Sequence, residues 1–147
     1  MGLRTAALVL LGLFLLAGQA LAATVQLEAH GGALVAEVTL NGRFTGRFLV
    51  DTGATYCVVT AEVARKAKIR GRIGGDKVRL ATANGVIEAR LGEARKVEVG
   101  EAAARDVPVA VVEDDPVPGL DGILGLSFLG RFRYTVDAEP GVLILDE

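Results

Sequence analysis

The sequence contains no tryptophan, one cysteine and one histidine among its 147 residues. Because Cys57 is the only cysteine, the chain cannot close an internal disulfide. Its apolar surroundings, Tyr56-Cys57-Val58-Val59, favour a small packed side chain over a nucleophile. The lone His30 has no co-ligands at metal-binding spacing, so no metal site is expected around it. The formal net charge of −2 gives no electrostatic reason to bind nucleic acid.

The chain also lacks internal repeats of 20–50 residues and has no linker after its first residues, which predicts one domain over 23–147. Those first residues are different. Arg4 precedes an apolar run over 6–17 and a small-x-small ending, Ala20-Leu21-Ala22. This order predicts a secretory signal over 1–22, cleaved before Ala23, and therefore a periplasmic or secreted protein. The alternative is an uncleaved, membrane-anchoring helix facing the periplasm, which is less favoured because the apolar run is short of a full span.

The remainder is predicted to be rich in β-strands. Apolar residues alternate over 34–40, the period of a half-buried strand, and Asn41-Gly42 follows as a strong hairpin signal. The return strand over 43–50 leads into Asp51. A second hairpin joins 78–82 to 87–91 through a turn at Asn84-Gly85.

Shorter elements complete the prediction. A helix over 61–68 is expected, with Thr60 as its N-cap, and Ser127 is expected to cap a helical turn through Leu129. Pro108 suggests an edge position or a strand start for 107–111. The loop acids Asp114, Asp115 and Asp121 lack any recognised calcium-loop spacing and are expected to be solvated. The remaining predicted strands are short and lie at 25–27, 56–59, 97–99, 123–126, 134–136 and 142–145.

The stretch most suggestive of chemistry is Phe48-Leu49-Val50-Asp51-Thr52-Gly53-Ala54. Three apolar residues run into an acid, and the acid runs into a turn of small residues. A strand therefore delivers a carboxylate to a loop, at the border of low-dielectric surroundings that can tune its pKa. A second apolar strand, Ile123-Leu124, likewise runs into a glycine, Gly125.

In this order, these features resemble the single-lobe, retroviral-type (retropepsin-like) aspartic proteases, particularly small exported bacterial members. The resemblance implies an all-β fold with one or two short helices, in which a closed, barrel-like lobe carries a flap hairpin. It makes Asp51 the catalytic residue and Thr52, Gly53 and Ala54 the loop that supports it. It also implies a flap at Thr82-Ala83-Asn84-Gly85, and an Ile123-Leu124-Gly125 element that crosses near the active-site loop.

The mechanism of this family needs two aspartates that share a proton and activate a water molecule. The chain has only one Asp-Thr-Gly, so the resemblance implies a homodimer with Asp51 from each subunit at the two-fold axis. Thr52 would then hydrogen-bond across the axis, and the Gly53 amide could bond the carboxylate. The substrate would be a peptide or protein bound as an added strand, without metal or organic cofactor.

Two other interpretations remain open from the sequence. One is an exported β-domain of the same fold that has lost activity and acts as a peptide-binding or assembly module. The intact Asp51-Thr52-Gly53 argues against it, because a binding module has no need of that carboxylate. The other is an unrelated small sandwich with a chance Asp-Thr-Gly, which the ordered set of features disfavours.

Overall fold

The computed structural model describes residues 21–71, 75–82 and 85–147. Residues 1–20 of the predicted signal, and Ala83 and Asn84 of the predicted flap, lie outside the described residues. In the described part, no helix is long and apolar enough to cross a membrane. The elements are β1 (Ala23–Gln26), β2 (Glu28–His30), β3 (Ala33–Leu40), β4 (Phe44–Val50), β5 (Cys57–Thr60), α1 (Ala61–Ala67), β6 (Arg70–Gly71), β7 (Lys77–Thr82), β8 (Gly85–Val99), β9 (Ala102–Val112), β10 (Gly122–Leu124), α2 (Leu126–Leu129), β11 (Arg133–Asp137) and β12 (Val142–Asp146).

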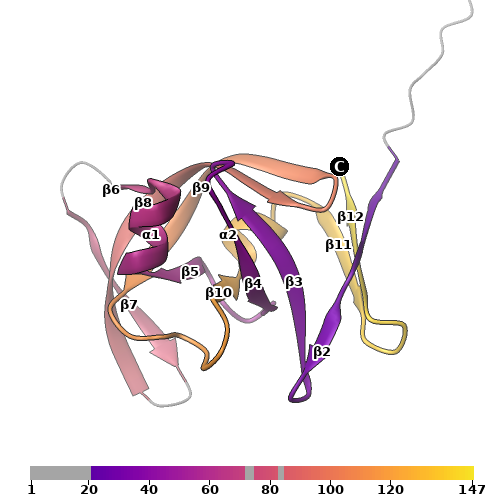
Figure 1. The fold of residues 1–147 in the computed structure, drawn as a ribbon, viewed down its shortest axis with the longest axis horizontal. Helices are drawn as coiled ribbons and strands as arrows, with labels where there is room; N and C mark the ends of the chain where they lie inside the picture. Colours follow the sequence, from indigo (N-terminus) through magenta and orange to yellow (C-terminus); the bar gives the residue numbers. More distant parts are fainter. Residues whose placement is uncertain (1–20, 72–74, 83–84) are drawn as a thin grey trace, which may run out of the picture.

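The main sheet is wrapped into a ring of strands (Figure 1). Its order is β2-β3-β4-β10-β5-β9-β8-β6, with β7 paired to β8. β3 also pairs with β8, at Thr39↔Glu98 and Leu40↔Val97. This pairing closes the strands β3-β4-β10-β5-β9-β8 into a ring. The expected all-β fold with two short helices is confirmed.

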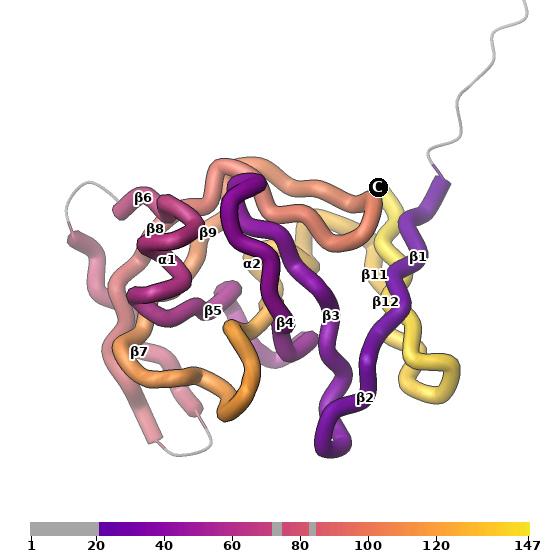
Figure 2. Tube along the Cα trace, in the orientation of Figure 1, coloured from indigo at the N-terminus to yellow at the C-terminus, as the bar shows by residue number. Residues whose placement is uncertain are grey.

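A smaller sheet, β1-β12-β11, lies at the end of the molecule away from the β7–β8 hairpin (Figure 1). Figure 2 shows the chain running from β1 into β2 as one extended segment. Because β1 pairs with β12 and β2 pairs with β3, this segment connects the two sheets. The predicted C-terminal hairpin is confirmed as β11–β12.

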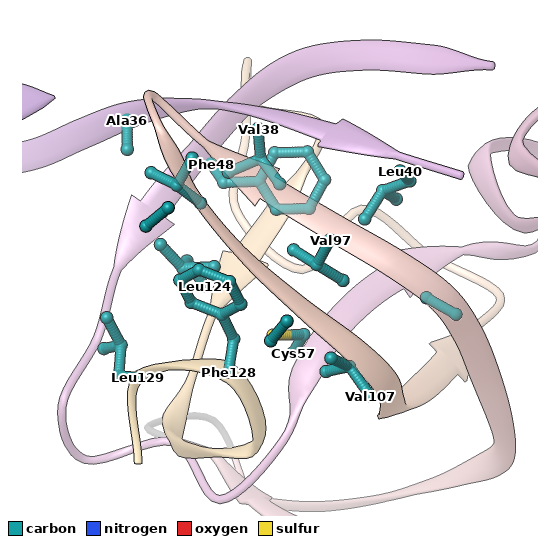
Figure 3. Packing of buried hydrophobic residues seen from close by; sticks show 14 of the residues in the cluster. Ala36, Val38, Leu40, Phe48, Cys57, Val97, Val107, Leu124, Phe128 and Leu129 are labelled. Carbon is teal, nitrogen blue, oxygen red and sulfur yellow. The ribbon is translucent and has the colours of Figure 1, made fainter. Parts of the chain in front are cut away.

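The interior of the ring is filled by side chains from strands far apart in the sequence (Figure 3). Phe48 of β4, Leu124 of β10 and Phe128 of α2 are almost fully buried and belong to one apolar cluster. Cys57 packs in the same cluster, as its apolar neighbours predict, and burial raises the pKa of its thiol. The loop over 51–56, which is the predicted active-site loop, is therefore tied to the core at its end by Cys57.

Helix α1 follows the expected capping chemistry. The Thr60 hydroxyl accepts a hydrogen bond from the Val63 amide at 3.2 Å, and Glu62 lies in the first turn. Lys68 ends the helix in a left-handed conformation, with φ of 52°. Arg65 and Lys66 are exposed in the last turn, where cations suit the helix dipole.

Two strand predictions need correction. Residues 87–91 and 97–99 are strand, as predicted, but they belong to one long strand, β8, because β9 pairs with it from Arg90 to Val99. Pro108 lies inside β9 rather than at a strand start, and it pairs with Glu93 of β8. The pairing of β9 with β5 begins one residue later, at Cys57↔Val109, so the proline precedes that ladder.

Candidate active site

Asp51 directly follows β4, an interior strand of the main sheet. β4 is flanked by β3 on one side and by β10 on the other. The Asp51 amide donates to the Leu124 carbonyl at 3.1 Å, which continues the parallel pairing of β4 with β10 by one residue. The backbone of the candidate catalytic residue is therefore held by the second apolar strand that the sequence singled out.

The Asp51 side chain is oriented by its own loop. The Gly53 amide donates to Asp51 Oδ1 at 2.8 Å, the hydrogen bond expected of this loop. The Ala54 amide donates to the Asp51 carbonyl at 3.3 Å and closes the turn. A Cβ on Gly53 would lie 3.2 Å from Asp51 Oδ1, so the absence of a side chain keeps room for the carboxylate. Asp51 is half-buried, so its side chain stays accessible. One of its two carboxylate oxygens is hydrogen-bonded within the loop.

Gly125 lies against the loop that carries Asp51. A Cβ on Gly125 would lie 2.3 Å from the Tyr56 carbonyl oxygen and 2.8 Å from that of Ala54. The next residue, Leu126, donates its amide to the Ala54 carbonyl at 2.8 Å. Ile123 and Leu124 pair with Leu49 and Val50 of β4. The structure therefore brings Ile123-Leu124-Gly125 and Asp51-Thr52-Gly53-Ala54 together, as expected.

The predicted role of Ser127 is wrong. Helix α2 begins at Leu126, after Gly125, and no side chain caps it. The Ser127 hydroxyl instead accepts a hydrogen bond from the Cys57 amide at 2.8 Å. No local signal in the sequence points to this contact, because the two residues lie 70 positions apart. Ser127 fixes the point where the active-site loop enters β5.

The candidate flap is only partly described. β7 and β8 pair from Lys77↔Arg90 to Thr82↔Gly85, and the Thr82 hydroxyl donates to the Gly85 carbonyl at 2.8 Å. Ala83 and Asn84 fall outside the described residues, so their place at the tip stays a prediction. Beyond the tip, Val86 and Ile87 expose 57% and 38% of their surfaces.

The inner part of this hairpin is attached to the strands around Asp51. Val78 and Leu80 of β7 pack on a small buried cluster that includes Val58 of β5. Ile123 of β10 and Tyr56, from the end of the active-site loop, also pack on this cluster. The hairpin thus shares an apolar contact region with the active-site elements.

The expectation that Asp121 is solvated is also wrong. Asp121 is half-buried, and its Oδ2 accepts the Arg47 amide at 2.8 Å while its own amide donates to the Arg47 carbonyl at 2.8 Å. Asp114 and Asp115 are exposed. In the residues that the structure describes, no group of three or more His, Cys, Asp or Glu side chains is arranged to hold a metal ion.

Comparison with known proteins agrees with this geometry. Residues 36–131 match the family described as gag-polyprotein putative aspartyl protease. The chain belongs to this family. The match contains the Asp51 loop, the β7–β8 hairpin and the whole Ile123-Leu124-Gly125 element. The predicted retropepsin-like resemblance is confirmed.

Solved structures show the same fold. A retropepsin-like aspartic protease from Rickettsia conorii superposes with a TM-score of 0.63 at 24% identity, covering 84% of this chain and 90% of that one. An aspartic proteinase from Irpex lacteus gives a TM-score of 0.60 at 23% identity, covering 84% of this chain. The chain spans only 34% of the Irpex lacteus protein. Among curated proteins, none matches the sequence.

Proposed function

We propose that the chain is an aspartic endopeptidase, active as a homodimer in which each subunit contributes Asp51. The observation that carries the proposal is the Asp51 carboxylate, presented half-buried on a loop that is bonded to β10 and oriented by the Gly53 amide. Two other aspartates, Asp121 and Asp137, are engaged elsewhere, with the Arg47 amide and the Glu139 amide respectively. Because the chain has one Asp-Thr-Gly, a second copy of Asp51 supplies the other carboxylate in this proposal.

The chemistry follows from placing two carboxylates side by side. Two adjacent carboxylates cannot both ionise cheaply, so one holds a proton. The ionised Asp51 removes a proton from a water molecule, whose oxygen attacks the peptide carbonyl carbon, while the protonated copy donates a hydrogen bond to the carbonyl oxygen. Proton transfer to the amide nitrogen then accompanies cleavage of the carbon–nitrogen bond. No metal or organic cofactor takes part in these steps.

The neighbouring residues support this chemistry. Thr52 hydrogen-bonds across the two-fold axis, Gly53 orients the carboxylate, and Ala54 lies below the site. The β7–β8 hairpin, with Thr82 to Gly85 at its tip, closes over an extended peptide. The peptide binds as an added strand, because strand edges around the site offer backbone partners.

The proposal also includes export. A signal over 1–22, removed before Ala23, would release the protease into the periplasm or the exterior. A retained segment would instead anchor it to the membrane.

The test is cleavage of an unstructured protein by the purified full chain at pH 3 to 7. Wild type, Asp51→Asn and a control, Asp114→Asn, are compared; Asp114 is an exposed loop acid. We expect the wild type and the control to cleave with an optimum below neutral pH, because one carboxylate of the pair must be protonated, and Asp51→Asn to be inactive. Equal cleavage by Asp51→Asn would overturn the proposal, because the activity would not depend on Asp51. No cleavage by the wild type at any pH would also overturn it, in favour of an inactive binding or assembly domain.

A further inference from the structure

We infer that Asp121 is a positioning residue for Asp51 and acts through β10. This inference rests on the proposed function, since it concerns the placement of the same carboxylate. Asp121 precedes Gly122, the first residue of β10, and Leu124 at the other end of β10 accepts the Asp51 amide at 3.1 Å. The three residues of β10 therefore span the distance between Asp121 and the candidate catalytic residue.

Asp121 holds β4 through two hydrogen bonds. Its Oδ2 accepts the Arg47 amide at 2.8 Å, and its amide donates to the Arg47 carbonyl at 2.8 Å. Both backbone polar groups of Arg47 are thus bonded to a single residue. Asp121 lies one residue before the start of β10. Its carboxylate accepts the Arg47 amide there, so the hydrogen bonding to β4 continues one residue beyond the strand.

Close packing fixes the position of this attachment. A Cβ on Gly46 would lie 2.6 Å from Asp121 Oδ2 and 2.9 Å from Asp121 Cβ, so the Asp121 side chain occupies the space that the glycine leaves. A Cβ on Gly122 would lie 2.4 Å from the Val58 carbonyl oxygen and 2.5 Å from the Phe48 ring. β10 therefore approaches both neighbouring strands closely at its first residue, and Asp121 lies directly before this contact.

The consequence for Asp51 comes from the parallel register. Gly122 pairs with Phe48, and Leu124 pairs with Val50, immediately before Asp51. If the Asp121 end of β10 is released, the Leu124 carbonyl loses a fixed position and the Asp51 backbone loses a fixed acceptor. A displacement of about 1 Å in a catalytic group can cost roughly a hundredfold in rate. Binding of an extended peptide relies on the flap and strand edges, so it depends less on β10.

The experiment measures kcat and KM for peptide cleavage by the full chain. We expect Asp121→Ala to lower kcat by about tenfold or more while KM stays within about twofold. Asp121→Asn should keep kcat within about threefold of wild type, because its side-chain oxygen still accepts the Arg47 amide. Asp114→Ala, which removes an exposed acid from the same loop, is the matched control.

A second readout does not depend on activity. The Asp51 amide is bonded to the Leu124 carbonyl, and we expect Asp121→Ala to speed its hydrogen exchange by about tenfold relative to Asp114→Ala. If Asp121→Ala does not fold, Asp121→Asn is compared with Asp121→Glu instead. The longer glutamate side chain does not fit the space beside Gly46, so we expect the Asp121→Glu variant to show the loss of kcat and the faster exchange.

The outcomes separate the two proposals. A wild type without protease activity contradicts the proposed function, and faster exchange at Asp51 would still support the positioning role. Unchanged kcat and unchanged exchange in Asp121→Ala would overturn that role. A raised KM with normal kcat, or an Asp121→Asn variant as impaired as Asp121→Ala, would overturn it as well.

Discussion

The Leu126 amide donates a 2.8 Å hydrogen bond to the Ala54 carbonyl, which bonds the start of α2 to the loop that carries Asp51. Two residues earlier, the Leu124 carbonyl accepts the Asp51 amide. The active-site loop is thus held at both Asp51 and Ala54 by one continuous segment, residues 124–126. This arrangement makes the geometry of the loop depend on a segment about 70 positions away in the sequence.

Gly125 is expected to tolerate no side chain. In Gly125→Ala, the new Cβ would meet the backbone oxygens of Tyr56 and Ala54, neither of which is a flexible side-chain end. We expect the free energy of unfolding to fall by about 3 kcal/mol, together with loss of activity. Chemical denaturation measures the first effect. Gly71→Ala is the control, since nothing lies within 4 Å of a Cβ there, and equal stability of the two variants would contradict the prediction.

Ser127→Ala should weaken the join between the active-site loop and β5. The substitution removes the acceptor of the partly buried Cys57 amide, and an unsatisfied donor of this kind costs about 1–3 kcal/mol. Thermal or chemical unfolding measures the loss. Thr24→Ala removes an exposed hydroxyl from β1 and should change stability by no more than about 0.5 kcal/mol. A Ser127→Ala protein as stable as this control would show that the hydrogen bond contributes nothing.

A shared active site predicts poisoning by inactive subunits. When wild type and Asp51→Asn are mixed in equal amounts and exchange subunits at random, only about one quarter of the dimers carry two intact copies of Asp51. We expect the activity per dimer to fall to about a quarter of wild type, provided that dimers with one Asp51 are inactive. The measurement is the initial cleavage rate against the fraction of variant. A linear decrease to one half would show that each subunit works alone.

The buried thiol of Cys57 predicts a loss of stability at alkaline pH. Burial raises the pKa of this thiol in the folded protein, whereas in the unfolded chain it titrates near its usual value of about 8.5. Between these two pKa values the unfolded state binds fewer protons, so the free energy of unfolding decreases as pH rises, by up to about 1.4 kcal/mol per pH unit.

The check is the unfolding free energy of wild type and Cys57→Ala at pH 7 and pH 10. In Cys57→Ala, the cavity left by the sulfur lowers the free energy of unfolding at both pH values, but there is no thiol to titrate. We therefore expect wild type to lose more stability than Cys57→Ala between the two pH values. The same loss in both proteins would contradict the prediction.

The sequence alone determined the features that depend on local chemistry. Alternating apolar residues and Asn41-Gly42 predicted the β3–β4 hairpin, and Thr60 predicted the start of α1, because strand period, turn conformation and capping act between near neighbours. Asp51-Thr52-Gly53, followed later by Ile123-Leu124-Gly125, was enough to indicate the family.

The tertiary structure decided which distant groups those residues meet. Nothing near Ser127 or Asp121 in the sequence indicates that they bind the backbone of Cys57 and Arg47, because each pair is joined only when β10 is inserted between β4 and β5. The continuity of β8 was likewise decided by its partner β9, whose long ladder outweighs the local interruption between the two predicted strands. Local sequence thus placed Asp51 at the end of a strand and supplied the Gly53 amide that bonds its carboxylate, and long-range pairing with β10 fixed the Asp51 backbone.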